Sequence, residues 1–412
     1  MTEIREVVNF VQMYKQWLTK RNDKHTLVKT QWELTGKCNF RCVHCYISGE
    51  NACYTGEKEL DCDQAIRLID DICAEGGLFI TFTGGEPLMR ADFGTIYRYA
   101  HRKGFRISLF TNGALLDAEM VSLLRQHPPR IVSISLYGIC GQTYGKITGD
   151  ERNYARVMRG IELLVQNGIH VGLKTPILTH NVHEIEAIRQ FVRTAIDDEP
   201  LFDPLLSYDL NCGSGPAQYR VDAETAAQIV VTSSRRREAE RKRKRPDDKR
   251  MSSEEYLTKA NEARLRKDDH HVVVSRCEGG LHNCLITPDG KLGVCSAFRE
   301  PAYDLRTGSL AEGFHQVMRK FKETRMSGLS ECSWCGYDPI CHSCAGHAIL
   351  ETGDPEKPVP FMCDVSKRIA REFGLTDIAE KYSALLQERR RQFMSEPSMS
   401  GQGRSEGGMP WK

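Results

Sequence analysis

The sequence lacks any apolar run long enough to cross a membrane. A membrane-spanning helix needs about 20 consecutive apolar residues, whereas the 412 residues have a mean hydropathy of -0.45 and only 40% hydrophobic side chains. Residues 1–24 alternate charged with hydrophobic side chains and lack the apolar core of a signal peptide. We therefore expect a cytoplasmic globular protein with no membrane partner.

A strong net charge is also absent. The 57 basic and 55 acidic side chains leave a formal charge of +2, so no overall field attracts nucleic acid, which is not an expected partner. The local exception is RRREAERKRKRPDDKR at residues 235–250, which holds ten basic and four acidic side chains. A solvated helical linker is its simplest interpretation, and a docking surface for an acidic peptide or a tRNA is the alternative.

Disulfide bonds are not expected among the 16 cysteines, because a long cytoplasmic chain uses cysteine mainly as free thiols or metal ligands. A chain of 412 residues also exceeds what one core usually organises. Two domains with smaller attachments are therefore the starting expectation.

Short β-branched runs alternate with helical patterns from residue 28 to about 211, which predicts parallel strands joined by crossover helices. Asp61 or Asp63 can cap one of these helices, and Asn181 with Glu184 forms a capping-box pattern ahead of another. Six units are fewer than the eight of a closed barrel, but the same rule places a site at the C-terminal ends of the strands. The expected strands are residues 27–34, 78–83, 106–111, 130–136, 170–177 and 201–210.

Three cysteines fall just after the first expected strand, in GKCNFRCVHCYISGE. Cys38, Cys42 and Cys45 have the spacing C-x3-C-x2-C, which is one thiolate short of a closed four-thiolate site. Soft thiolates on one loop can hold three corners of a 4Fe-4S cluster, and the fourth iron then stays open for a ligand. The alternative is a zinc site that takes His44 or Cys53 as its fourth ligand.

These residues resemble the radical S-adenosylmethionine (SAM) superfamily, whose motif is C-x3-C-x-aromatic-C on the loop after the first barrel strand. The resemblance implies that His44, in the usually aromatic slot, lies against the adenine and that Ser135 in SISLYG touches the ribose. It also implies that the second signature, FTGGEPLM, holds the methionyl end of SAM, because glycines let the backbone approach and a carboxylate can pair with the amino group. The residues of this signature are Gly84, Gly85, Glu86 and Pro87.

Eight further cysteines lie between residues 277 and 363. Their number suffices for two four-thiolate clusters, although the two C-x2-C pairs of residues 332–344 also have zinc-ribbon spacing. The pattern resembles the SPASM extension of radical SAM proteins, which carries two auxiliary 4Fe-4S clusters. The resemblance assigns one cluster to Cys277, Cys284, Cys295 and Cys344, and the other to Cys332, Cys335, Cys341 and Cys363.

The fold class implied is α/β, with a partial (β/α)6 TIM-like radical SAM barrel and a C-terminal Cys-rich SPASM domain that binds the auxiliary clusters. In that domain, the sequence PDG predicts a hairpin turn. The expected divisions are an N-terminal helical extension (1–27), the barrel (28–220), a charged helical linker (221–272), the SPASM domain (273–370), a C-terminal helix (371–395) and a disordered tail (396–412).

As the resemblance implies, a reductant of the flavodoxin or ferredoxin type supplies an electron, and SAM is cleaved to a 5'-deoxyadenosyl radical that removes hydrogen from the substrate. SLYGICGQTYGKITG and TPILTHN look like segments of maturases of ribosomal peptide natural products (RiPPs). The expected reaction installs a thioether or carbon-carbon crosslink in a precursor peptide. An anaerobic sulfatase maturase is the rival, but Ser296 stands where such enzymes carry an aspartate. A non-catalytic SAM-binding iron-sulfur scaffold or sensor is the alternative from another class.

The catalytic base is not identifiable from the sequence. Cys140 and Cys212 lie just beyond the fourth and sixth expected strands, and together with Tyr137 and Lys174 they could line the cavity, although each is more often structural than catalytic. About 30 residues precede the first strand, too few for a fused winged-helix domain that grips a leader peptide. A separate leader-peptide recognition protein, or residues 235–250, would then bind the precursor.

Overall fold

The computed structural model describes residues 27–47, 58–248, 250–265, 282–323 and 330–395. The expected N-terminal extension apart from residue 27, the expected tail, Cys53 and Cys277 lie outside the described residues. Among the helices of the described segments, none is long and apolar enough to cross a membrane.

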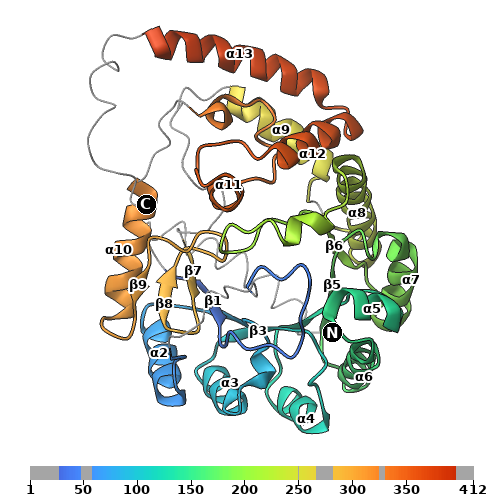
Figure 1. Ribbon diagram of the computed structural model, residues 1–412, viewed down its shortest axis with the longest axis vertical. Coiled ribbons are helices and arrows are strands. Elements are labelled where there is room, and N and C mark those ends of the chain that lie inside the picture. Colours follow the sequence, from blue (N-terminus) through green and yellow to red (C-terminus); the bar gives the residue numbers. More distant parts are fainter. Residues whose placement is uncertain (1–26, 48–57, 249, 266–281, 324–329, 396–412) are drawn as a thin grey trace.

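A nine-stranded sheet forms the centre of the molecule, in the order β6-β5-β4-β3-β2-β1-β7-β8-β9 (Figure 1). Its first six strands are parallel neighbours in chain order, which confirms the predicted α/β arrangement of six units. The last of them is shorter than expected, because Pro204 cannot donate a ladder hydrogen bond. The six are β1 (Lys29–Glu33), β2 (Phe79–Thr83), β3 (Arg106–Thr111), β4 (Ile131–Ser135), β5 (Val171–Pro176) and β6 (Leu201–Asp203).

The C-terminal segment extends the same sheet, although the change in composition predicted a separate module. β7 (Asn283–Ile286) pairs in parallel with the free side of β1. β8 (Lys291–Gly293) and β9 (Tyr303–Asp304) follow in antiparallel order. The predicted hairpin turn joins β7 to β8, and Gly290 within it has a φ of 83°, which favours glycine.

Helices cover one face of the parallel strands (Figure 1). Asp61 caps the first of them in a capping box with Gln64, as one of the two predicted caps. The capping box predicted at Asn181 is wrong, because that side chain donates to the carbonyl oxygens of Tyr137 and Pro176 instead. The covering helices are α2 (Cys62–Ala74), α3 (Phe93–Arg102), α4 (Ala118–Gln126), α6 (Arg152–Gln166) and α7 (Ile185–Ile196).

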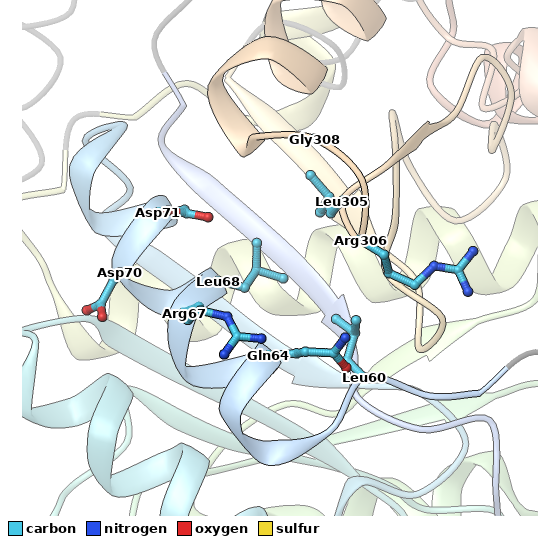
Figure 2. A pocket seen from close by; sticks show the side chains of 9 residues that line it. All are labelled: Leu60, Gln64, Arg67, Leu68, Asp70, Asp71, Leu305, Arg306 and Gly308. Atoms are coloured by element: carbon cyan, nitrogen blue, oxygen red, sulfur yellow. The ribbon is translucent and has the colours of Figure 1, made fainter.

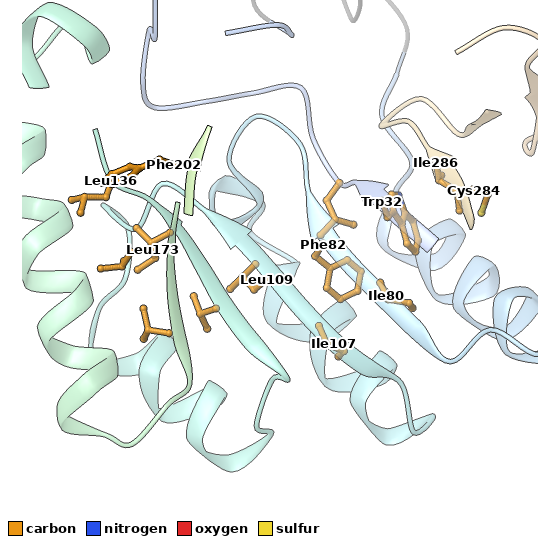
Figure 3. Packing of buried hydrophobic residues seen from close by; sticks show 14 of the residues in the cluster. Trp32, Ile80, Phe82, Ile107, Leu109, Leu136, Leu173, Phe202, Cys284 and Ile286 are labelled. Atoms are coloured by element: carbon orange, nitrogen blue, oxygen red, sulfur yellow. The ribbon is translucent and has the colours of Figure 1, made fainter. Parts of the chain in front are cut away.

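The strands turn an apolar face toward these helices, and their alternate positions are largely polar. Phe82 packs edge-on against Phe93 of α3 with 6.3 Å between the ring centroids. Side chains of this layer from β1 to β7 are shown in Figure 3, and each contributes roughly 1.5–3 kcal/mol on burial. Because successive side chains of a strand alternate between faces, the other face collects Glu33, Thr83, Ser108, Ser133, Ser135, Lys174 and Asp203.

The remaining helices build the C-terminal half. The expected linker is a packed element, because the first turns of α8 are buried against α12. An ion pair between Arg220 and Glu351 ties the segment before α8 to α11. These helices are α8 (Ala223–Lys244), α9 (Ser253–Leu265), α10 (Leu310–Glu323), α11 (Ala345–Thr352), α12 (Pro360–Glu372) and α13 (Thr376–Ser395).

Candidate active site

The cysteine triplet lies on the loop that follows β1, at the C-terminal edge of the parallel strands. Burial is the main cause that raises the pKa of the Cys38 thiol to about 11, and the neighbouring Glu86 and Cys45 raise it further. Burial also raises the pKa of Cys42, to which Cys45 and Cys38 add. The three sulfur atoms therefore lie close enough to repel one another as thiolates, and a cation among them would favour their ionised form.

The donor set of this loop fits an iron-sulfur cluster. The backbone N–H of Phe40 points at the Cys38 sulfur at 3.4 Å, and the Asn112 amide lies 3.9 Å from the same sulfur. Such N–H groups stabilise cluster thiolates. Within the described ranges, no group of three or more His, Cys, Asp or Glu side chains is spaced to hold a single metal ion. The zinc alternative with Cys53 as fourth ligand lies outside the described residues.

The GGEP loop after β2 is joined directly to the loop of the triplet. The N–H of Gly85 donates to the Thr35 carbonyl and that of Glu86 to the Lys37 carbonyl, both at 2.8 Å. A Cβ on Gly84 would lie 2.4 Å from the Thr35 oxygen, and Gly84 has a φ of 127°. The glycines are therefore required for the two backbones to meet, and their role in SAM binding stays a prediction.

Replacing Gly85 with alanine should weaken SAM binding. Its Cβ would lie 2.3 Å from the Lys37 carbonyl oxygen, so the loop that carries Cys38 must move. We expect the Kd for SAM to rise at least about tenfold, as equilibrium dialysis of the reconstituted protein would show. Gly94→Ala is the matched control, because its Cβ would have 3.6 Å to its nearest neighbour. Equal affinities of the two variants would contradict the role given to the GGEP loop.

Glu86 anchors a third loop to these two. Its carboxylate has no exposed surface and accepts hydrogen bonds from the N–H of Leu88, the hydroxyl of Thr111 and the N–H of Asn112. Burial raises the pKa of Glu86 to about 7. Its side chain is therefore a positioning group between β2 and β3. Pro87, at the start of the short helix that follows, is buried.

Asn112 is a site residue that the sequence analysis missed. It follows β3 in the sequence FTNG, and its side-chain amide donates to the side-chain oxygen Oδ1 of Asn39 at 2.7 Å. The signal that could have found it is a polar pair followed by glycine directly after a strand that ends at the site edge. Gly113 provides the turn with a φ of 81°.

Aromatic side chains wall the triplet on the β4 side. The Tyr137 ring meets the His44 ring edge-on at 5.2 Å, and the Cys42 thiol donates to the Tyr137 oxygen at 3.6 Å. Burial raises the pKa of Tyr137 well above its usual value, so it stays a neutral phenol, with Ser135 as a hydrogen-bond partner. Burial lowers the pKa of His44 to about 4. Among the described residues its Nδ1 has no partner, which leaves a polar atom for a ligand.

Lys174 and Asp203 form an ion pair at the ends of β5 and β6, with 2.9 Å between Nζ and Oδ2. Both side chains are about two-fifths exposed. Burial lowers the pKa values of His44, His342 and His347, and the charge of Asp203 acts on all three in the opposite direction. Asp203, which the sequence analysis did not single out, therefore lies between the triplet and the C-terminal cysteines.

The other two candidate thiols contact neighbouring structural elements. Cys140 begins α5 (Gly141–Thr148), and its sulfur lies 3.3 Å from the Thr143 hydroxyl and 3.8 Å from a Glu184 oxygen. Cys212 has a φ of 62°, and its thiol donates to the Ile349 carbonyl at 3.7 Å. The catalytic roles of both thiols stay predictions.

Four C-terminal cysteines gather as the resemblance implies for the second auxiliary cluster. Burial raises the pKa of Cys332 to about 11, and the charges of Cys335 and Cys341 raise it further. The pKa of Cys363, on α12, is likewise raised to about 11 by burial and then by Cys341, Cys332 and Cys335. These effects place the four thiols within electrostatic range of one another, and a cluster held by them stays a prediction.

The set predicted for the first auxiliary cluster is less uniform. The turn after Cys295 touches the start of α11, which follows Cys344, because a Cβ on Gly346 would lie 3.0 Å from the Ala297 carbonyl oxygen. Cys284 is instead 2% exposed on β7, where its thiol donates to the Thr30 hydroxyl at 3.7 Å (Figure 3). A thiol in such an apolar layer is typical of a packing residue, so its assignment as a ligand stays a prediction.

A cleft of about 360 Å³ on the outer side of the molecule belongs to a different place (Figure 2). Its side chains come from α2 and from the segment after β9, and they include Arg67, Asp71 and Arg306. Asp70 at its rim is paired with Lys103. Because α2 lies on the helical face of the sheet, this cleft is separate from the C-terminal strand ends that carry the triplet.

Residues 32–193 match the model of the Radical SAM superfamily, a span that contains the triplet, the GGEP loop and β2 to β5. The chain carries a radical SAM domain. The radical SAM family is catalytic and implies a 4Fe-4S cluster and SAM, both of which fit the donor set described above. The chain is accordingly an enzyme. The family match agrees with the resemblance that the cysteine triplet and the GGEP sequence indicated.

The chain is similar in sequence to proteins named for tetrapyrrole synthesis and to one named for bacteriocin synthesis. The Fe-coproporphyrin III synthase of Methanosarcina barkeri (strain Fusaro / DSM 804) is 38% identical over 157 residues, which cover 38% of this chain and only 39% of that protein. An AdoMet-dependent heme synthase of the same strain is 26% identical over 344 residues, 80% of this chain and 94% of that protein. The antilisterial bacteriocin subtilosin biosynthesis protein AlbA of Bacillus subtilis (strain 168) is 30% identical over 164 residues, 39% of this chain and 36% of that protein.

Solved structures show the same fold over most of the radical SAM chain. Streptococcus suis SuiB bound to S-adenosylmethionine has a TM-score of 0.61 at 15% identity, covering 87% of this chain and 80% of SuiB. SuiB has also been solved with its precursor peptide SuiA. The match covers more than the family span and extends into the cysteine-rich half, so both parts of this chain share the fold of SuiB.

Proposed function

We propose that this radical SAM enzyme acts on a ribosomally made precursor peptide and installs a thioether or carbon-carbon crosslink. When bound, the cluster and SAM supply a 5'-deoxyadenosyl radical that removes a hydrogen atom from the substrate. The observation that carries the radical step is the direct backbone joining of the GGEP loop to the loop of Cys38, Cys42 and Cys45. That joining fixes the SAM-binding segment against the cluster ligands.

The residues of the chain then have separate tasks. Cys38, Cys42 and Cys45 would hold three irons and leave the fourth for the amino and carboxylate groups of SAM. Glu86 holds the β3 loop in place, and Tyr137 closes the site over Cys42 and excludes water from it. The polar face of the strands would receive the part of the substrate that reacts.

The choice of a peptide is supported by three observations. SuiB, whose fold this chain shares, has been solved with a precursor peptide, and AlbA is named for a bacteriocin. In addition, four C-terminal cysteines gather close together, and we propose that they and the Cys295 set hold two auxiliary 4Fe-4S clusters. Such clusters could accept the electron that crosslink formation releases. A flavodoxin- or ferredoxin-type reductant and a separate leader-peptide recognition protein complete the proposed system.

A tetrapyrrole substrate is the second candidate. The heme synthase relative aligns with 80% of this chain, including the C-terminal half, whereas AlbA aligns with only 39%. In that case Lys174, which faces the site, would bind a substrate carboxylate. The sulfatase-maturase alternative has less support, because the position after Cys295 is a serine.

One experiment tests the radical step and separates the substrates. The anaerobically reconstituted enzyme is reduced with dithionite in the presence of SAM, and 5'-deoxyadenosine is quantified. We expect it to form, and its absence would reject the proposed function. Coexpression with short cysteine-containing reading frames beside the gene, followed by mass spectrometry, should show a peptide that has lost two hydrogens. Decarboxylation of added Fe-coproporphyrin III instead would establish the tetrapyrrole candidate.

A further inference from the structure

A cleft of about 1050 Å³ lies between the end of β6, the helices α8 and α9, and the C-terminal cysteine segment. Nothing in the proposed chemistry accounts for it. It is lined by side chains of two kinds, and its inner end reaches the candidate active site. These features together indicate what the cleft binds.

The first kind of lining is apolar and unusually exposed. Leu201 is 38% exposed, Met251 is 42% exposed and Tyr256 is 59% exposed, and all three line this one cleft. Val230 and Phe373 add apolar surface beside them. Scattered exposed hydrophobic residues need no explanation, whereas a group of them on the walls of one cleft marks an interaction surface.

The second kind of lining is cationic and incompletely paired. Within the described residues, Arg237 makes no hydrogen bond or ion pair, and burial lowers its pKa despite the charge of Glu199. The Nε of Arg241 lies 3.4 Å from Asp248 Oδ2 without hydrogen-bond geometry in the described part of the chain, and its Nη2 donates to the carbonyl oxygens of Arg250 and Met251. Arg250 is paired with Asp248. Arg241 and Arg250 therefore share the Asp248 carboxylate, whereas Arg237 has no ion-pair partner among the described residues.

A hydroxyl group adds a second orphaned polar atom. Ser233 is 3% exposed on α8, and its Oγ finds no hydrogen-bond partner among the described residues. It lines the same cleft as Arg241. Buried polar atoms are nearly always satisfied in native proteins, so the unsatisfied Ser233 hydroxyl, with the unpaired Arg237 guanidinium four residues further along the same helix, points to a ligand that supplies acceptors.

The inner end of the cleft leads to the site. Asp203 lines it, and Asp203 is the partner of Lys174 at the strand ends. Cys341 and His342 line it as well, from the group of four cysteines proposed to hold the second auxiliary cluster. A chain lying in the cleft would therefore run from the basic part of α8 toward the space between the triplet and that group.

We propose that this cleft binds a segment of the precursor peptide in which acidic and aliphatic side chains alternate, outside the part that is modified. Carboxylates of the segment pair with Arg237 and Arg241, and its aliphatic side chains cover Leu201, Met251 and Tyr256. The inference rests on the proposed function in that the substrate is a peptide. It assigns part of the recognition expected of residues 235–250 to a defined pair of arginines.

A model peptide tests the cleft. Full-length reconstituted enzyme is titrated into a fluorescein-labelled peptide of six alternating glutamate and leucine pairs, and anisotropy gives the Kd. We expect Arg237→Glu/Arg241→Glu to raise the Kd at least about tenfold. The matched control Lys242→Glu/Arg245→Glu makes the same change in charge in the last turn of α8 and at the residue that follows it, outside the lining, and should change the Kd less than about twofold. Equal losses in both pairs, or no loss in either, would overturn the proposal.

Two further measurements keep the test sharp. Tyr256→Ser removes a largely exposed side chain, so the fold stays intact, and it should weaken binding of the glutamate-leucine peptide. A peptide of the same length that alternates lysine and leucine should bind neither the wild type nor this variant. A twelve-nucleotide oligouridylate is tested in the same way. If it bound the wild type more tightly than the peptide does, and if the arginine variant lost that affinity, the cleft would be a nucleic-acid site and the proposal would be overturned.

The cleft and the proposed function can fail separately. Formation of 5'-deoxyadenosine without peptide should be the same in the wild type, the arginine variant and its control, because the cleft lies outside the cysteine triplet. If the wild type formed no 5'-deoxyadenosine, the proposed radical function would be wrong, and the peptide-binding measurement would still test the cleft. If 5'-deoxyadenosine formed normally and the arginine variant bound the peptide with the same Kd as the wild type, only the cleft proposal would be wrong.

Discussion

Cys42→Ala is expected to abolish reductive SAM cleavage and to remove the iron of the triplet. Cys42 is the middle cysteine of the triplet predicted to hold the cluster, and its thiol contacts the Tyr137 hydroxyl. A 4Fe-4S cube held by only two thiolates is not retained during purification. Anaerobically reconstituted protein should therefore contain about four fewer iron atoms per chain, and 5'-deoxyadenosine should fall to the background of the assay.

Cys73→Ala provides the matched control for this result. Cys73 is an exposed thiol near the end of α2, on the helical face of the sheet. Its loss should leave both iron content and 5'-deoxyadenosine formation unchanged. If the Cys42 variant kept the full iron content and cleaved SAM at the rate of the control, the triplet would not be the cluster site, and the proposed function would lose its foundation.

Spacing along the chain was sufficient to predict the triplet and the GGEP loop. Each of these two motifs occupies only a few consecutive residues, so it can be read from the sequence without knowledge of distant contacts. The six parallel units were predictable for the same reason, since period-2 runs and amphipathic helices are local patterns. β6 was predicted too long because its apolar run continues past Pro204, where the ladder must stop.

Contacts between distant segments were not predictable from one sequence. Asn181 and Glu184 have capping-box spacing, but the amide of Asn181 binds carbonyl oxygens after β4 and β5, and the carboxylate of Glu184 accepts the N–H of Ile139. Asn112 reaches the triplet across 73 residues of sequence. Cys284 has the spacing of a ligand, yet pairing of β7 with β1 places it in the apolar layer. In each case tertiary packing decides the role of the side chain.

The pairing of β7 with β1 also explains why the two halves depend on each other. Arg299, four residues after Cys295, extends its guanidinium to Glu33 at the end of β1. Its Nη2 lies 2.8 Å and 3.0 Å from the two carboxylate oxygens of Glu33, whose side chain has no exposed surface. The strand that leads into the triplet is thereby tied to the cysteine-rich segment through a buried charge pair.

Arg299→Met should consequently destabilise the whole protein, lowering the free energy of unfolding by about 3–5 kcal/mol, because a buried carboxylate loses its charged partner. Urea unfolding of the cluster-free protein measures this change. Glu33→Gln combined with Arg299→Met should recover part of the loss, since no buried charge then needs compensation. Arg306→Met is the control, because Arg306 pairs with Asp304 at the surface and should change stability by less than about 1 kcal/mol. A similar small change for Arg299→Met would mean that the strand pairing alone holds the two halves together.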